Sequence, residues 1–234
     1  MTDALEARRR AILDELGVTA YRRRGSAAGA VRSATDEPAA APRVAPPPGP
    51  DWPELAAAVA GCTLCALHRT RTHTVFGTGD RQARLLVVGE APGAEEDRQG
   101  EPFVGRAGQL LNSMLRAAGF ARAEVYIANV LKCRPPDNRD PNSEEAALCL
   151  PYLRRQIELV RPRVLLCVGR IAAQRLLGVE TPLARLRGQV HELGGVPVVV
   201  TYHPAYLLRS PTEKRKAWTD LQLALRLLGD GDRT

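Results

Sequence analysis

Four short runs of the chain are apolar at nearly every position instead of at alternate positions. They cover residues 84–90, 125–131, 164–169 and 197–203. A strand with one face in water alternates apolar and polar residues, whereas a strand covered on both faces does not. The pattern therefore predicts four buried strands of a parallel sheet.

The segments between and after these runs have the apolar spacing of helices that cover a sheet. The predicted helices span residues 107–118, 143–160, 171–177 and 213–228. The second opens in "PNSEE", which offers an Asn or Ser cap and acidic residues in the first turn. Strand and helix alternate along the chain, which favours right-handed crossovers. The predicted fold class is α/β, a three-layer α/β/α sandwich around a four-stranded parallel sheet.

The composition changes near residue 50. Residues 25–50 are rich in Ala, Pro and Gly and offer little to bury, which is typical of an extended linker. Residues 3–24 could form a short amphipathic helix ending in "YRRR". We therefore predict an N-terminal extension and linker over 1–50, disordered or partly helical, and one folded domain over 51–234.

The net charge of the chain indicates a class of binding partner. The formal net charge is +7, and only three of the 33 basic residues are lysines. An excess of arginine suits phosphate contacts, so the composition favours nucleic acid over simple solubility. No apolar run approaches the roughly 20 residues that span a bilayer, and the N-terminal segment lacks a signal-peptide core. We expect a cytoplasmic, monomeric protein without membrane contacts.

Polar residues gather where the four predicted strands end, which is where open α/β sheets bind ligands. The segments at these four ends are, in chain order, "GEAPGAEED" (89–97), Asn129 with "LKCRPPDNRDP", "GRIAAQ" (169–174) and "HPAYLLR" (203–209). An amide inside an apolar strand must find partners or cost roughly 1–3 kcal/mol, which favours a ligand-facing Asn129. Phe103 fits a core anchor and a stacking platform equally well. The Gly-rich turn matches neither phosphate-loop nor dinucleotide fingerprints.

Four of the five cysteines form a frame suited to a metal. Cys62 and Cys65 are spaced C-x2-C, and Cys133 and Cys149 follow at a wider interval. Because disulfides are rare in the cytoplasm, four thiolates indicate zinc or an iron–sulfur cluster, and spacing alone does not decide between them. Cys167 lies within a predicted strand and is expected to be a buried apolar residue.

Three motifs and the cysteine frame carry a family resemblance over roughly residues 52–228. "GEAPGAEEDRQGEPFVGRAGQLL", "NVLKCRPPDNRDP" and "HPAYLLR", in this order with C-x2-C and C-x15-C, resemble the family 4 uracil-DNA glycosylases. These thermostable-type members of the uracil-DNA glycosylase superfamily hold a [4Fe–4S] cluster. A covalently trapping relative carries "GEQPG" and an Arg-rich loop with a histidine. Here Ala91 and "CRPPDNRDP" stand in those places, so turnover is expected.

The resemblance implies a reaction and residue roles. The reaction is hydrolysis of the bond between uracil and deoxyribose in single- or double-stranded DNA, which initiates base excision repair. His203 would stabilise the leaving uracil, and Asn129, Phe103 and Ala91 would bind the base. Leu207 would be the wedge that fills the gap in the helix. Candidates for orienting water or supporting the loop are Glu90, Glu96 and Asn138. Candidates for phosphate contacts are Arg106, Lys132, Arg134, Arg170 and Arg209. The implied cluster ligands are Cys62, Cys65, Cys133 and Cys149.

Two other classes stay open from the residues alone. A non-catalytic, metal-stabilised DNA-binding module needs the basic surface and cysteines, but no convergence of polar groups. A nucleotide-binding transferase would use the Gly-rich turns for phosphates, although the chain has no phosphate-loop lysine. Release of free uracil from a uracil-containing oligonucleotide separates both from a glycosylase.

Overall fold

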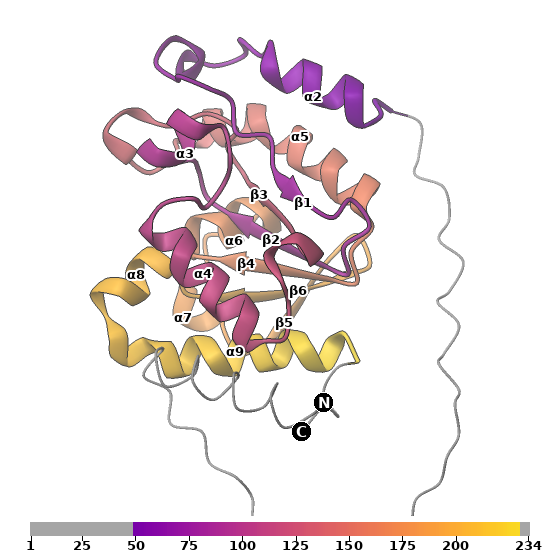
Figure 1. Ribbon diagram of the computed structural model, residues 1–234, viewed down its shortest axis with the longest axis vertical. Helices are drawn as coiled ribbons and strands as arrows, with labels where there is room; N and C mark the ends of the chain where they lie inside the picture. Colours follow the sequence, from indigo (N-terminus) through magenta and orange to yellow (C-terminus); the bar gives the residue numbers. More distant parts are fainter. Residues whose placement is uncertain (1–48, 230–234) are drawn as a thin grey trace, which may run out of the picture.

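The computed structural model describes residues 49–229, in which six strands form one sheet in the order β1-β3-β2-β4-β6-β5 (Figure 1). The four central strands, β3, β2, β4 and β6, are parallel, as predicted. β1 and β5 add an antiparallel strand at each edge. The strands are β1 (Thr78–Gly79), β2 (Leu85–Gly89), β3 (Tyr126–Asn129), β4 (Val164–Val168), β5 (Val190–Leu193) and β6 (Val196–Thr201). The prediction of a purely four-stranded parallel sheet is therefore too narrow.

The two edge strands escaped prediction for physical reasons. β1 has only two residues, too few to carry a pattern. β5 alternates exposed and half-buried positions, so it lacks the continuous apolar run of a central strand. It is joined to β6 by Gly194 and Gly195, which both have positive φ angles, +57° and +82°. Two such residues between antiparallel strands form a tight hairpin that other residues adopt only with strain.

Helices cover the sheet, and the four predicted ones are confirmed to within one residue at each end. They are α4 (Arg106–Ala117), α5 (Ser143–Val160), α6 (Arg170–Leu177) and α9 (Lys214–Leu227). α5 is capped as expected, since the Asn142 side chain accepts from Glu145 N and Glu145 bonds back to Asn142 N. The other helices are α2 (Trp52–Ala60), α3 (Ala94–Gln99), α7 (Leu183–Leu186) and α8 (Pro204–Arg209), with 3₁₀ turns η1 (Ala66–Arg69), η2 (Arg122–Glu124), η3 (Pro136–Asn138) and η4 (Pro211–Glu213).

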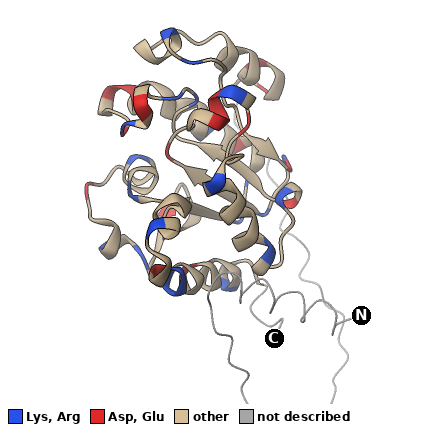
Figure 2. Ribbon diagram, turned by 60° about the vertical axis from the view of Figure 1, so that its left-hand side comes forward, with Lys and Arg blue, Asp and Glu red and all other residues tan. Residues whose placement is uncertain are grey.

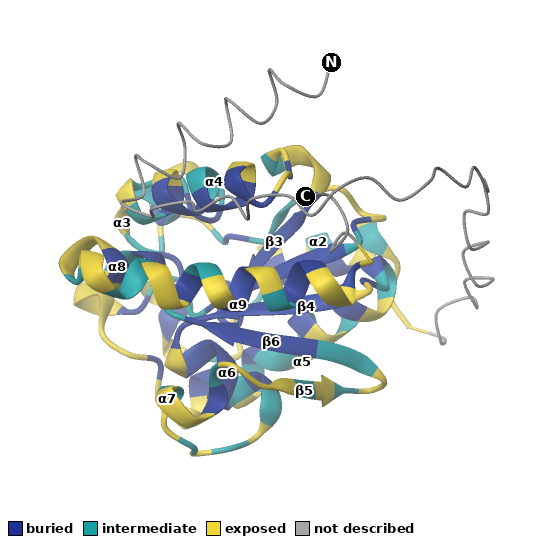
Figure 3. Cartoon of the chain, turned by 90° about the horizontal axis from the view of Figure 1, so that it is seen from below, coloured by how far each residue is buried: buried dark blue, intermediate teal, exposed yellow. Residues whose placement is uncertain are grey.

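The sheet separates two apolar cores, which confirms the three-layer α/β/α sandwich. Alternate residues of the central strands face α4, α8 and α9 on one side. The intervening residues face α5, α6 and α7 on the other side, where Cys167 is fully buried as predicted. Figure 3 shows the buried central strands behind α9 and the more exposed β5 at the edge.

The N-terminal extension predicted over 1–50 lies, apart from Gly49 and Pro50, outside the described residues. Within residues 49–229, no helix has the length and apolar character needed to cross a bilayer.

Candidate active site and cysteine pocket

The site begins where β2 and β3 end side by side. Their register pairs Gly89 with Asn129. A side chain at Gly89 would collide with Asn129 Oδ1, and its Cβ would lie 2.6 Å from Phe103 Cζ. The absence of a side chain at Gly89 thus lets the Asn129 amide and the Phe103 ring approach each other. Asn129 is 1% exposed, and its Oδ1 has no hydrogen-bond partner in the described part of the chain. A buried amide oxygen without a partner is costly unless a ligand supplies the donor.

Glu96 supports the loop that carries Phe103. Its Oε1 accepts from Val104 N and Gly105 N, each at 3.0 Å, and its Oε2 accepts from Gly93 N at 3.1 Å. Three backbone donors thus bind one carboxylate between the start of α3 and the start of α4. Of the two roles predicted for Glu96, orienting water and supporting the loop, this geometry favours the second.

His203 caps α8 and thereby fixes the position of its own proton. Its Nδ1 accepts from Ala205 N at 3.1 Å, and Pro204 occupies the first helical position. A neutral imidazole that accepts at Nδ1 carries its proton on Nε2. Burial, helped by the charge of Arg209, lowers the pKa of His203 to about 4, so the ring is neutral at physiological pH. The ring centroid of His203 lies 5.8 Å from that of Phe103.

The other histidines are arranged differently. A ring nitrogen of each lies at hydrogen-bond distance from a backbone carbonyl: His68 from Cys65 O, His73 from Asp97 O and His191 from Leu186 O. A nitrogen facing a carbonyl must carry the proton itself. Of the four histidines, only His203 has a ring nitrogen bound to a backbone N–H.

Glu90 lies just beyond β2 with a perturbed carboxyl group. Burial, strengthened by the negative charge of Asp140 and opposed by Arg170, raises the pKa of Glu90 to about 7. Asp140 itself pairs with Arg170 Nη2 at 3.2 Å. A carboxyl group that titrates near neutral pH is suited to exchanging a proton with water.

The remaining predicted residues lie around this rim. Asn138 Oδ1 accepts from Arg134 Nε at 2.8 Å, which ties η3 to the chain after β3. Ala91 packs against the apolar wall of the cysteine pocket. Arg106, Arg170 and Arg209 are exposed and can reach a ligand in solvent. Figure 2 shows basic residues distributed over many elements, with a run of acidic residues on α3.

The prediction that Lys132 contacts phosphate is wrong. Lys132 is 1% exposed, and its Nζ donates to Asn129 O at 2.9 Å, Gln156 Oε1 at 2.6 Å and Phe76 O at 3.2 Å. All three protons of the ammonium group are bound inside the protein, so it has none left for a surface anion. Lys132 instead holds the end of β3 against α5.

The prediction that Leu207 is a wedge also fails in this structure. Leu207 is 1% exposed and packs in the core between α4 and α9, beside Leu110 and Met114. The expected loop is the helix α8, which turns Leu207 inward and leaves the next residue, Leu208, 38% exposed.

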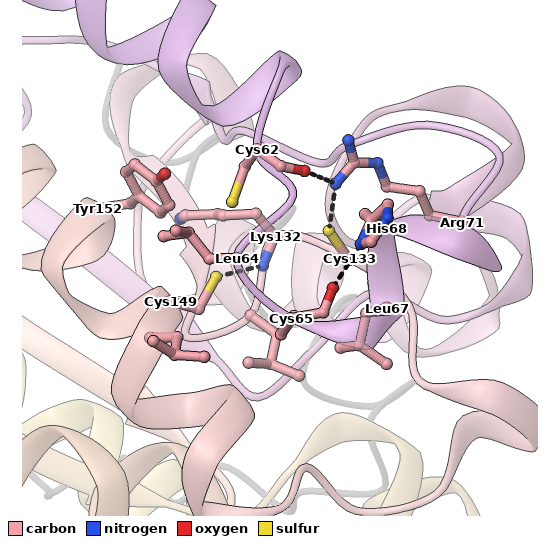
Figure 4. Close-up of a pocket in the computed structure, with 12 residues that line it drawn as sticks. Cys62, Leu64, Cys65, Leu67, His68, Arg71, Lys132, Cys133, Cys149 and Tyr152 are labelled. Atoms are coloured by element: carbon pink, nitrogen blue, oxygen red, sulfur yellow. Dashed lines mark hydrogen bonds between the residues drawn. The ribbon is translucent and has the colours of Figure 1, made fainter.

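The four predicted ligand cysteines line one pocket. Cys62 and Cys65 lie between α2 and η1, Cys133 follows β3 and Cys149 lies on α5. Figure 4 shows their side chains converging from these three segments, with Arg71 and Tyr152 at the rim. All four thiols are free, and the surrounding wall is apolar.

Two donors are directed at these sulfur atoms. Arg71 Nη1 donates to Cys133 Sγ at 3.1 Å, and Lys132 N donates to Cys149 Sγ at 3.2 Å. Donors at sulfur favour thiolates, whereas burial raises the pKa of Cys149 to about 11 and favours the thiol. A bound cationic group would resolve this conflict in favour of the thiolate.

The donor set fits an iron–sulfur cluster. Four thiols without nitrogen or oxygen ligands are the usual set for [4Fe–4S], and zinc accepts the same four ligands. Within residues 49–229, no group of three or more His, Cys, Asp or Glu side chains is arranged to hold a single metal ion.

Sequence reasoning missed two residues of these sites. Arg71 reaches Cys133 across 62 positions of the chain, so no local pattern could reveal the contact. Asp140 was quoted within "CRPPDNRDP" but not singled out, although its charge acts on Glu90. Its place in the polar segment that follows the second predicted strand was the available signal.

Comparison with known proteins shows the family to which the chain belongs. The family model for the uracil DNA glycosylase superfamily matches residues 76–222. A type-4 uracil-DNA glycosylase from Archaeoglobus fulgidus is 46% identical over 179 residues, which cover 73% of this chain and 90% of the relative. One from Thermotoga maritima is 48% identical over 151 residues, 64% of this chain and 79% of the relative. A type-5 uracil-DNA glycosylase from Pyrobaculum aerophilum is 37% identical over 146 residues, 55% of this chain and 64% of the relative.

The α/β/α sandwich and the polar rim at its strand ends are thus those of the uracil-DNA glycosylase superfamily. Within that superfamily the chain belongs to the type-4 family, since type-4 relatives match it with higher identity and over more of its length than the type-5 relative. The resemblance drawn from the three motifs and the cysteine frame is confirmed.

We predict that Lys132→Met lowers the free energy of unfolding by about 1–3 kcal/mol, because Asn129 O and Gln156 Oε1 lose a buried donor. Urea denaturation measures this change. Arg106→Met, on the exposed start of α4, is the matched control and should change stability by less than about 0.5 kcal/mol. Equal stability of the two variants would contradict the internal role of Lys132.

Proposed function

We propose that this chain excises uracil from DNA by hydrolysing the N-glycosidic bond, which leaves an abasic site and initiates base excision repair. The observation that carries the proposal is the unpartnered, buried Asn129 Oδ1 next to Phe103, with the neutral His203 on the same rim. These side chains supply an acceptor, an aromatic face and a proton donor, which together match the groups of a flipped uracil.

The amide of Asn129 selects the base by its hydrogen-bonding edge. Uracil presents an N3–H donor and an O4 acceptor, which pair with Asn129 Oδ1 and Nδ2. Cytosine presents an acceptor and an amine at the same places, so both bonds would be lost. A site that leaves buried polar groups unpaired with the wrong ligand discriminates strongly. Phe103 stacks on the base, and Glu96 acts through Phe103 by holding its loop.

His203 stabilises the charge that develops as the bond breaks. Electrons of the glycosidic bond move to uracil, whose O2 becomes anionic, while positive charge develops on the sugar. The Nε2–H of His203 donates to that oxygen. Its neutral state is fixed by burial and by the Ala205 N–H at Nδ1, so no proton has to move first.

Glu90 is the proposed carboxylate that orients the attacking water. It follows directly on Gly89, on the same rim as Asn129 and His203. In its ionised form it accepts a proton from water and offsets the positive charge of the sugar. Asn138 supports the neighbouring loop through Arg134.

Contacts with DNA come from basic side chains of the rim, of which Arg134 is half-buried and the others are exposed. Arg106, Arg134, Arg170 and Arg209 pair with phosphates, and these bonds position the strand without reading its sequence. Extruding a base leaves a gap that an apolar side chain fills. We assign this wedge to Leu208, because it is exposed and Leu207 is not.

The cysteine pocket holds a [4Fe–4S] cluster in this proposal, with Cys62, Cys65, Cys133 and Cys149 as ligands. Hydrolysis moves no electrons, so the cluster supplies a covalent cross-link between the segment after α2, the chain after β3 and α5. Arg71 and Lys132 support it, and Lys132 joins it to the backbone of Asn129. The cluster thereby fixes the chain that leads from the uracil site to the DNA surface.

Release of uracil from a uracil-containing oligonucleotide tests the function. Under single-turnover conditions we expect His203→Ala to slow release roughly 10²–10³-fold with little change in DNA affinity, since one preorganised donor is lost. His203→Ser keeps a helix cap without the imidazole and should be equally slow. His191→Ala is the control and should retain near wild-type activity.

If His203→Ser cuts at the wild-type rate, the histidine serves only as a cap. If the wild type binds DNA and releases no uracil, the chain is a DNA-binding module instead of an enzyme.

The pH dependence tests Glu90. Its raised pKa of about 7 means that the carboxyl is neutral below that pH and ionised above it, so single-turnover release should rise through pH 7 and then level. Glu90→Gln should be slow and independent of pH over the same range. His203, with a pKa of about 4, does not titrate there. A wild-type rate that is flat through pH 7 would exclude Glu90 as the carboxylate that binds water.

Colour and metal content test the cluster. Anaerobically purified protein should be brown, and Cys133→Ala should lose both colour and thermal stability. Cys167→Ala should stay brown, because that thiol is buried in the core opposite α6. Stoichiometric zinc without acid-labile sulfide would contradict the iron–sulfur assignment.

A further inference from the structure

A stack of three side chains lies beside the uracil site and takes no part in the chemistry proposed above. The rings of Tyr202 and Tyr206 are stacked, with centroids 5.0 Å apart and planes inclined by 27°. The guanidinium carbon of Arg187 lies 4.1 Å from the centroid of the Tyr202 ring. Tyr202 directly precedes His203, and Tyr206 lies on the first turn of α8, where its N–H donates to His203 O at 2.9 Å. The stack is therefore connected directly to His203 through the backbone.

The inner end of the stack is firmly held. Arg187 Nε donates to Asp220 Oδ2 at 2.8 Å, and Arg187 Nη2 pairs with the same oxygen at 2.7 Å. Asp220 is 1% exposed, on the buried side of α9. An ion pair in which both partners are largely buried is kept in one geometry, so Arg187 gives Tyr202 a fixed support. The rings are thus arranged before any ligand arrives.

The outer end of the stack is open. Tyr206 is 37% exposed although one side of its ring is stacked on Tyr202. Its neighbours along α8 are the exposed Leu208 and Arg209. An aromatic face beside an apolar and a basic side chain has the composition of a nucleic-acid stacking surface. A peptide partner would need a longer apolar surface than Tyr206 and Leu208 provide.

We propose that Tyr206 is a stacking platform for the nucleobase of a nucleotide that adjoins the excised uracil in the same strand. This inference rests on the proposed function, because it takes the strand to cross α8 when uracil meets His203. Extruding uracil unstacks its neighbour on one side, and that neighbour exposes a face that Tyr206 covers. Because every base has such a face, the platform stabilises bound DNA without selecting sequence.

A double-mutant cycle between protein and DNA tests the platform. The ligands are single-stranded oligonucleotides that carry 2′-fluoro-2′-deoxyuridine, which resists cleavage. In one the neighbours of uridine are thymidines, and in two others a baseless tetrahydrofuran replaces the 5′ or the 3′ neighbour. Tyr206→Ala should weaken binding of the first about tenfold, equivalent to about 1.4 kcal/mol. It should leave unchanged the binding of the oligonucleotide that lacks the stacked base.

Matched variants separate stacking from other effects. Tyr206→Phe keeps the ring and should bind like the wild type. Val190→Ala removes an exposed apolar side chain from β5, away from the rim, and should have no effect. Arg209→Ala should reduce the salt dependence of binding, whereas Tyr206→Ala should not, since stacking releases no counterions.

Equal weakening of all three oligonucleotides by Tyr206→Ala, or no weakening of any, would overturn the platform. Uracil release by the wild type is measured in parallel on the cleavable oligonucleotide. If the wild type releases uracil and the cycle shows no coupling, only the platform fails. If it releases none, the proposed function fails as well.

Discussion

The close approach of β2 and β3 at their carboxyl ends is the constraint on which the site depends. Parallel pairing sets Gly89 opposite Asn129, and only a residue without Cβ leaves room there for both the amide and the Phe103 ring. Phe103 itself has a positive φ angle of 54°, an unfavourable conformation for a bulky residue. Three backbone donors bound to Glu96 hold that loop in place. The Glu96 carboxylate and the absence of a side chain at Gly89 thus set the positions of the Asn129 amide and the Phe103 ring.

The cysteine pocket is connected to this point through a single residue. Lys132 donates from its backbone to Cys149 and from its side chain to Asn129 O. Lys132 therefore binds both the sulfur-lined pocket and the end of the strand that carries Asn129. This arrangement links the cysteine pocket to the end of β3, so a change in the pocket can displace Asn129.

Features of the fold that depend on repeated patterns could be predicted from the sequence, and features that depend on one side chain's direction could not. The central strands and long helices repeat their apolar spacing over many residues, so the tertiary structure has little to override. Asn129 can be singled out from the sequence because an amide contradicts its apolar surroundings. Lys132 was misjudged because its side chain turns inward just past β3, where alternation no longer applies. α8 has six residues, too few to show which of two adjacent leucines faces the core. Arg71 meets Cys133 only through the tertiary fold.

The hydrogen bond that caps α8 also determines which ring nitrogen of His203 carries the proton. The nitrogen that accepts from Ala205 N is the one whose occupation forces the proton onto Nε2, so the ring cannot change tautomer without uncapping its own helix. Tautomer exchange, which is free for a histidine in water, is here coupled to the opening of a turn that also carries Tyr206 and Leu208. The direction in which the imidazole presents its N–H and the shape of the turn that carries Tyr206 and Leu208 are therefore set together, because one hydrogen bond from the backbone of α8 determines both.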